Sequence, residues 1–258
     1  MPQHRMGWRA DKPDFRDKTL TLPYLSRFKV VLPSSVDLRP DMPPVVDQGD
    51  LGSCTANAIA GAVEYMHMKS ALPVFPPSRL FIYYNERFME NTVAVDAGAE
   101  IRDGIKSIKK MGVCDESIWP YDISKFTQRP TDQAYGSAKS AEITTYLKVT
   151  QNLTYLMATL AKGYAIVFGI TVYQSIDSAE KTGIVPMPAQ SEATLGGHAI
   201  LMVGYDTSAK TFTFRNSWGA DWGNKGYGTL PFDYVLHPGL ASDFWCIPTI
   251  PSATVPTS

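Results

Sequence analysis

The apolar residues in the first half of the chain recur at helical spacing. The apolar positions after Cys54 are Ala56, Ile59, Ala60, Val63 and Met66. Intervals of three and four residues predict an amphipathic helix from Cys54 to about Ser70. The same spacing predicts helices over residues 79–90 and 100–110. Residues 45 to about 135 should therefore form a helical lobe.

From residue 142 the pattern becomes that of strands. Short apolar or alternating runs predict strands over residues 142–149, 164–173, 183–186, 199–205 and 211–215. One short helix is expected over residues 153–162. The second half, residues 140–247, should therefore be a β-rich lobe. The order of a helical lobe and then a β lobe predicts an α+β fold with a cleft between its halves, and such clefts commonly bind ligands.

Composition narrows the possible partners. The chain has 258 residues, of which 44% are hydrophobic and 19% charged, with a net charge of −1. It has no basic excess, so we expect no nucleic-acid partner. No apolar run reaches the roughly 18 residues that span a bilayer, so we expect no membrane partner. No secretory signal sequence is visible at the N-terminus.

The cysteines are few. The chain has three, Cys54, Cys114 and Cys246, and an odd, low count argues against a disulfide framework. Cys114 and Cys246 could pair, but the sequence favours two separate free thiols. A reducing compartment fits this pattern. Two locations therefore stay open, the cytoplasm and export without a signal sequence.

The two ends of the chain differ from its body, residues 34–247. Residues 1–33 contain the apolar residues Trp8, Phe15, Leu20, Leu22, Tyr24, Leu25 and Phe28. This is too much apolar surface for a free tail, so the extension should pack on the body. It lies either over the cleft or on the back of the β lobe. Residues 248–258 are rich in proline and hydroxyl side chains, which predicts a flexible tail.

Four polar residues carry candidate chemistry. Cys54 lies at a predicted helix N-terminus, where unpaired backbone N–H groups favour a thiolate. Gln48 precedes it in a turn-rich loop, and an amide beside a backbone N–H can form an oxyanion hole. His198 begins one apolar run, and Asn216 ends an alternating strand. A cysteine nucleophile, a base and an orienting group are thus all present.

These residues lie in motifs that resemble the papain-like cysteine proteases. The motifs are Val36-Asp37-Leu38-Arg39, the loop from Gln48 to Cys54, Gly197-His198-Ala199, Asn216-Ser217-Trp218-Gly219 and Trp222-Gly223. Their order and separation resemble the family over roughly residues 32–248. The resemblance implies a papain-like two-lobe fold, with a β-barrel-like C-terminal lobe and the active site in the cleft. It also implies a monomeric cysteine endopeptidase that acts on peptides or proteins and has no cofactor or metal.

The resemblance assigns a role to each catalytic candidate. Cys54 and His198 would form a thiolate–imidazolium pair, and Cys54 would carry a thioester intermediate. Asn216 would orient His198, and Gln48 would hold the oxyanion. The chain departs from the family pattern at Leu51, where the family usually has a disulfide cysteine. It also departs at Thr55, where the family usually has tryptophan.

The substrate contacts come from the resemblance too. Gly98 and Ala99 would pair with the peptide backbone, although Gly98 could simply begin the third helix. Gly197 would offer a carbonyl to the peptide, and Trp218 would cover the contact between His198 and Asn216. Two alternatives stay open. One is a thioester-forming acyltransferase or transglutaminase-like enzyme, and the other is a papain-like module that binds peptides without cutting them.

Overall fold

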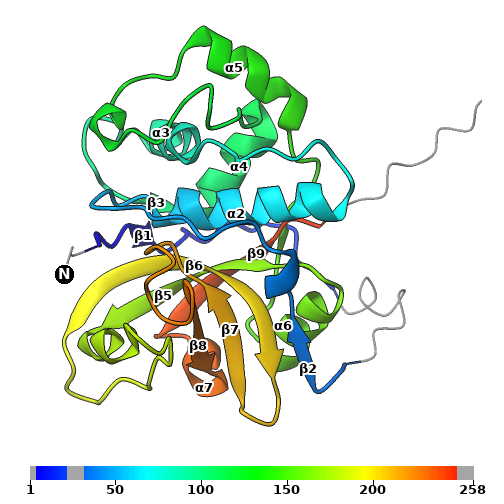
Figure 1. Cartoon of the computed structure of the whole chain (residues 1–258), viewed down its shortest axis with the longest axis vertical. Helices are drawn as coiled ribbons and strands as arrows, with labels where there is room; N and C mark the ends of the chain where they lie inside the picture. Colours follow the sequence, from blue (N-terminus) through cyan, green and yellow to red (C-terminus); the bar gives the residue numbers. More distant parts are fainter. Residues whose placement is uncertain (1–3, 22–31, 249–258) are drawn as a thin grey trace, which may run out of the picture.

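The structure is a computed structural model that describes residues 4–21 and 32–248. It has two lobes, as expected, and helix α2 runs along the boundary between them (Figure 1). The helices of the first lobe are α2 (Cys54–Lys69), α3 (Arg79–Met89), α4 (Ile101–Met111) and α5 (Asp132–Ala138). No helix in the described ranges has both the length and the apolar character needed to cross a membrane.

The second lobe is built on a seven-stranded antiparallel sheet. Its strand order is β4-β9-β5-β6-β7-β8, and β2 also pairs with β6. The strands are β2 (Ser35–Asp37), β4 (Leu147–Lys148), β5 (Ile166–Tyr173), β6 (Thr194–Asp206), β7 (Thr211–Arg215), β8 (Tyr227–Pro231) and β9 (Ala241–Cys246). Helices α6 (Leu153–Ala161) and α7 (Phe232–Leu236) belong to the same lobe.

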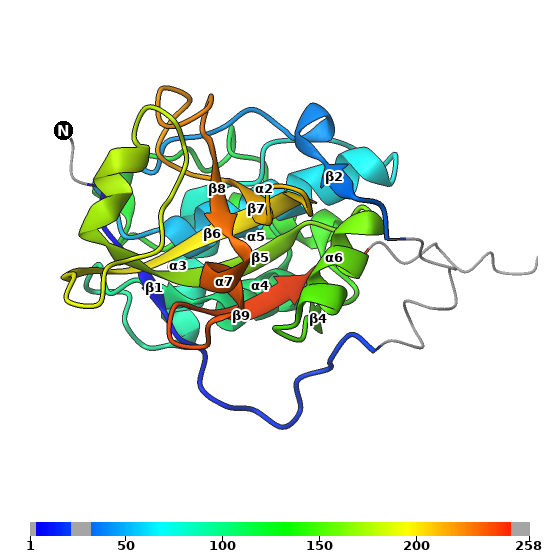
Figure 2. The ribbon, with the colours of Figure 1, turned by 90° about the horizontal axis from the view of Figure 1, so that it is seen from below.

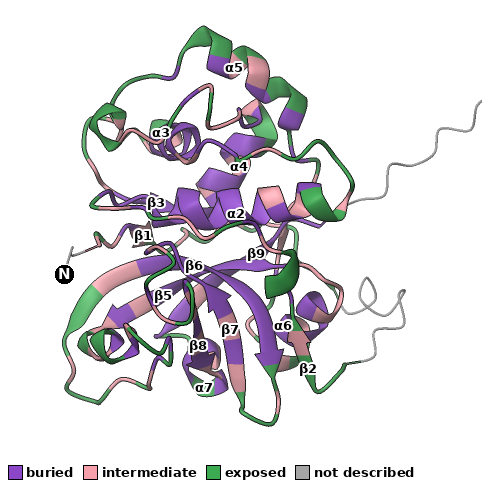
Figure 3. Ribbon diagram, viewed as in Figure 1, coloured by how far each residue is buried: buried purple, intermediate pink, exposed green. Residues whose placement is uncertain are grey.

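Helix α2 is buried on nearly every side because it lies between the lobes. Twelve of its sixteen residues are buried, including polar Thr55 and Asn57. Figure 3 shows the same burial continuing into the central strands of the sheet. A helix enclosed in this way is held rigidly by its neighbours. The residue at its N-terminus, Cys54, is therefore placed by both lobes at once.

Several expected elements differ in extent. The strand expected over residues 142–149 shrinks to Leu147–Lys148, because only these two residues pair with β9. The strand expected over residues 183–186 is a single bridge between Ile184 and Thr229. Strands β8 and β9 and helices α5 and α7 were not predicted. Residues 22–31 of the N-terminal extension and the tail from residue 249 lie outside the described residues.

All three cysteines fall within the described ranges, and all three are buried free thiols. Cys114 and Cys246 therefore do not pair, as the sequence favoured. Burial raises the pKa of the Cys114 thiol to about 11 and that of the Cys246 thiol to about 12. Burial thus disfavours the reactive thiolate form of both groups.

Candidate active site

Cys54 is the first residue of α2, and its side chain is fully buried. The loop before it turns at Gly49, which has a φ of +59°, a conformation that glycine adopts without strain. The backbone of Ala199, the residue after His198, hydrogen-bonds to the Cys54 thiol. The helix of one lobe and strand β6 of the other therefore meet at this sulfur.

His198 and Asn216 are directly bonded. The Nε2–H group of His198 donates to Oδ1 of Asn216 at 2.8 Å, and both side chains are buried. Nδ1 of His198 is buried and has no hydrogen-bond partner among the described residues. The ring of Trp218 stacks on the His198 ring, with centroids 4.7 Å apart. Asn216 and Trp218 thus hold the ring in place, and Nδ1 is left as the nitrogen that can accept a proton.

Gln48 is held by bonds at both ends of its amide. Its Oε1 accepts from the Ser217 hydroxyl at 2.7 Å, and its Nε2 donates to the Leu51 carbonyl at 2.9 Å. Nε2 also donates to the carbonyl of Arg5 at 3.0 Å. An amide N–H fixed in this way at the start of the Cys54 loop can hold a developing oxyanion.

A second layer that the sequence did not reveal supports the Gln48 loop. The Tyr121 hydroxyl donates to the Gln48 carbonyl at 3.0 Å. The guanidinium of Arg79 lies 3.8 Å from the centre of the Tyr121 ring and donates to the Asp47 carbonyl at 2.9 Å. The carboxylate of Glu116 binds the same guanidinium through both oxygens. The loop is therefore braced by an ion pair and an aromatic ring.

A sequence model described as papain family cysteine protease matches residues 32–242. The chain belongs to this family. It is 43% identical to an uncharacterized peptidase C1-like protein of Acanthamoeba polyphaga mimivirus, over 93% of this chain and 86% of that one. It is 29% identical to procathepsin L of Felis catus, over 83% of this chain and 65% of that protein. The crystal structure of xylellain, a cysteine protease from Xylella fastidiosa, is similar with a TM-score of 0.87 and 41% identity, covering 95% of this chain and 96% of that one.

In this papain-family chain the N-terminal extension contacts residues of both lobes near Cys54. We call residues 4–12 the cleft segment. Its strand β1 (Trp8–Arg9) pairs in parallel with β3 (Ala99–Glu100), and the Ala99 N–H donates to the Gly7 carbonyl at 2.8 Å. Figure 1 shows β1 at the boundary between the lobes. Figure 2 shows the chain continuing from β1 past β9 and β4, where Thr19 bridges to Lys148.

The cleft segment is in close backbone contact with the cleft walls. A Cβ atom added to Gly7 would lie 1.8 Å from the carbonyl oxygen of Gly52. One added to Gly98 would lie 2.0 Å from the Gly7 oxygen, and one added to Gly197 would lie 2.3 Å from the Trp8 oxygen. The glycines expected to contact a substrate therefore contact the chain's own backbone.

His4, at the start of the cleft segment, contacts Trp218. Its ring stacks on Trp218 with centroids 5.3 Å apart and an angle of 3° between the planes. Beyond Trp218 an open groove of about 670 Å³ is lined by residues that include Asp47, Ile176 and Trp222. Trp218 thus borders both the catalytic histidine candidate and an open groove.

Burial opposes charge separation at the covered site. It raises the pKa of the Cys54 thiol to about 12, although hydrogen bonds from the backbone of Ala199, Gly7 and Thr55 offset part of the effect. It lowers the pKa of His198 to about 4, against the effect of the Asn216 hydrogen bond. Burial thus opposes the charged forms of both groups, while the hydrogen bonds at each favour them. The expected thiolate–imidazolium pair stays a prediction.

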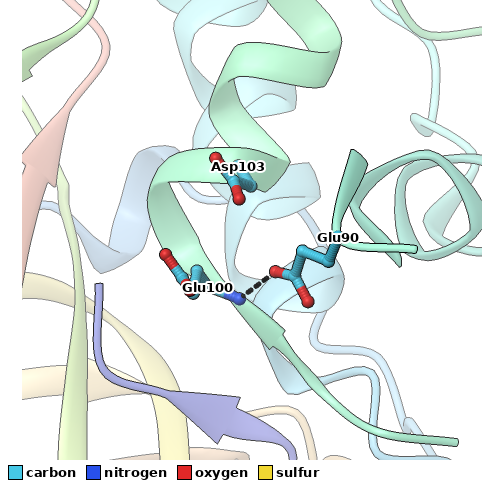
Figure 4. Close-up of side chains that lie close together, drawn as sticks. All are labelled: Glu90, Glu100 and Asp103. Carbon is cyan, nitrogen blue, oxygen red and sulfur yellow. Dashed lines mark hydrogen bonds between the residues drawn. The ribbon is translucent and has the colours of Figure 1, made fainter. Parts of the chain in front are cut away.

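An acidic cluster lies at the other end of the segment. Carboxylate oxygens of Glu90, Glu100 and Asp103 approach within 4.8 Å of one another (Figure 4). Glu90 accepts the Glu100 N–H at 2.7 Å and also forms an ion pair with Arg9. Glu100 lies 3.5 Å from the guanidinium of Arg102. Arginine side chains thus already supply positive charge to these carboxylates.

Proposed function

We propose that the chain is a cysteine endopeptidase in which Cys54 is the nucleophile and His198 the general base and acid. The observation that carries this proposal is the His198–Asn216 bond, which leaves Nδ1 as the free nitrogen at the strand position that meets Cys54. An imidazole held in one tautomer, with its second nitrogen free, can act as the base for a thiol, and the backbone of the next residue, Ala199, hydrogen-bonds to the Cys54 thiol.

The reaction then follows from these positions. The Cys54 proton passes to Nδ1 of His198 as the sulfur attacks the peptide carbonyl. Nε2 of Gln48 and the Cys54 N–H stabilise the negative oxygen that forms. His198 gives its proton to the leaving amine, and a thioester remains on Cys54. His198 then removes a proton from water, and the water oxygen attacks the thioester carbonyl. The carbon–sulfur bond breaks, the acid leaves, and His198 returns the proton to the Cys54 sulfur.

Endopeptidase action is favoured by the open groove beyond Trp218. Residues after the cleaved bond need space on the leaving-group side, and the groove of about 670 Å³ provides it. Peptides blocked at both ends should therefore be cut internally, and mass spectrometry of the products tests this. Cleavage confined to peptides with a free terminus would contradict endopeptidase action. Transfer of the acyl group to an added amine in preference to water would identify an acyltransferase.

Substitution of Gln48 tests the oxyanion hole. Gln48→Ala should lower kcat by about 10²–10³, as the loss of one oxyanion donor does, with little change in KM. Ser217→Ala is the matched control, because it removes the 2.7 Å bond to Gln48 but keeps the donor. It should have a much smaller effect on kcat. Equal losses in the two variants would indicate that Gln48 only supports the loop.

We also propose that the cleft segment keeps the enzyme inactive at rest. It uses the Gln48 N–H and the Ala99 N–H, which a substrate would need. Its Gly7 backbone also hydrogen-bonds to the Cys54 thiol. Of the two positions expected for the extension, these contacts favour the one over the cleft for residues 4–12.

A further inference from the structure

We propose that the cleft selects peptides in which an aromatic residue neighbours a basic one, and that Glu90 is the residue that recognises the basic side chain. The inference rests on the proposed function, because it treats the cleft segment as an occupant of the substrate site. The segment carries the sequence Arg5-Met6-Gly7-Trp8-Arg9. For Trp8 and the two arginines, the structure shows which residues of the cleft contact each side chain.

The aromatic side chain has a dedicated space. A Cβ atom added to Gly169 of β5 would lie 2.0 Å from the Trp8 indole, and one added to Gly197 of β6 would lie 2.7 Å from it. Both strands therefore lack side chains where the ring lies. The ring also packs against the buried core. A cleft wall shaped in this way favours a flat, wide side chain.

The basic side chain meets a carboxylate that is already in position. Glu90 is the C-cap residue of α3, and its side chain is 6% exposed when paired with Arg9. One of its oxygens is fixed by the Glu100 N–H, and the other oxygen meets the Arg9 guanidinium. A buried carboxylate at a helix C-terminus is unfavourable without a cation, because the helix dipole is negative there. When Arg9 leaves, a basic residue of another peptide would restore this pairing.

A second pair repeats the arrangement at the other end of the segment. Arg5 lies 3.2 Å from Asp96, whose side chain is 8% exposed. Asp96 also accepts from the Gly52 N–H and the Tyr83 hydroxyl, so it too is fixed before an occupant arrives. The net charge of the chain is only −1, so Glu90 and Asp96 form a local negative charge in the cleft and not part of a general acidic surface. Both arginines of the segment thus meet nearly buried carboxylates.

The test compares blocked peptides that contain Trp-Arg, Trp-Gln or Trp-Glu, each also made in the reverse order so that strand direction does not decide the result. Binding is measured by fluorescence anisotropy on the full chain carrying Cys54→Ala, and kcat/KM is measured on the full chain with Cys54. Displacing the cleft segment costs every peptide the same, so the ratios between peptides do not depend on it. Because the binding assay needs no turnover, failure of the proposed peptidase activity is distinguishable from failure of this inference.

We expect the arginine peptide to bind about tenfold more tightly than the glutamine peptide in at least one order, with the glutamate peptide weakest. Glu90→Gln keeps an acceptor for the Glu100 N–H, and it should abolish the difference between arginine and glutamine. Asp132→Asn removes an exposed carboxylate far from the cleft and should leave the difference intact. Equal or undetectable binding of all the peptides, or a preference that survives Glu90→Gln, would overturn the proposal.

Discussion

Replacing Cys54 by alanine should abolish peptide hydrolysis while the protein stays folded. Removing a catalytic nucleophile costs up to about 10⁶ in kcat, because the remaining groups can only polarise the substrate. The thiol is a small, fully buried group, so its replacement by alanine removes little packing. Measurements of kcat on a blocked peptide and of the melting temperature test both parts.

The matched control is Cys114→Ala, which removes another buried thiol from the helical lobe. It should lower stability by an amount typical of a small core change and leave kcat unchanged. When the cleft segment is displaced, a thiol-directed inhibitor should label Cys54 and spare Cys114 and Cys246. Hydrolysis that persists in a folded Cys54→Ala protein would assign the nucleophile to another residue.

The catalytic candidates were predictable because each carries a local signal. Cys54 follows turn residues and begins an apolar helical pattern, and His198 and Asn216 lie at the ends of apolar runs. The two-lobe α+β fold follows from the change of periodicity near residue 142. The structure brings His198 and Asn216 into contact and places Cys54 against the same strand. Their catalytic roles stay predictions.

The burial of the site, which opposes charge on Cys54 and His198, was not predictable, because it depends on tertiary packing. A helix N-terminus favours a thiolate, and the sequence showed that feature alone. The sequence did not show that Gly7 and Trp8 pack against the site from a segment more than forty residues away. Strand β9 was not predicted either, because its backbone is irregular. Its residue Asp243 has a φ of +57°, an interruption that breaks any simple alternation.

Substitution of Gly7 should weaken docking of the cleft segment and so open the active site to substrate. A Cβ atom at Gly7 would lie 1.8 Å from the Gly52 oxygen, a backbone atom that cannot move aside without disturbing the Cys54 loop. Overpacking of this kind typically costs about 1–3 kcal/mol, which here weakens docking of the segment. If the docked form predominates, kcat/KM rises in proportion to the uncovered fraction. We therefore expect Gly7→Ala to raise kcat/KM on short peptides by a factor on the order of ten.

The control is Gly136→Ala, since an added Cβ atom there has no neighbour within 4 Å. That variant should have unchanged kinetics. Gly7→Ala should also speed alkylation of Cys54 by iodoacetamide, because water returning to the site lowers the desolvation that opposes the thiolate. The two readouts separate opening of the cleft from a change in turnover. If both stay at their original values in a folded Gly7→Ala protein, the segment has a structural role and restraint of activity lies elsewhere.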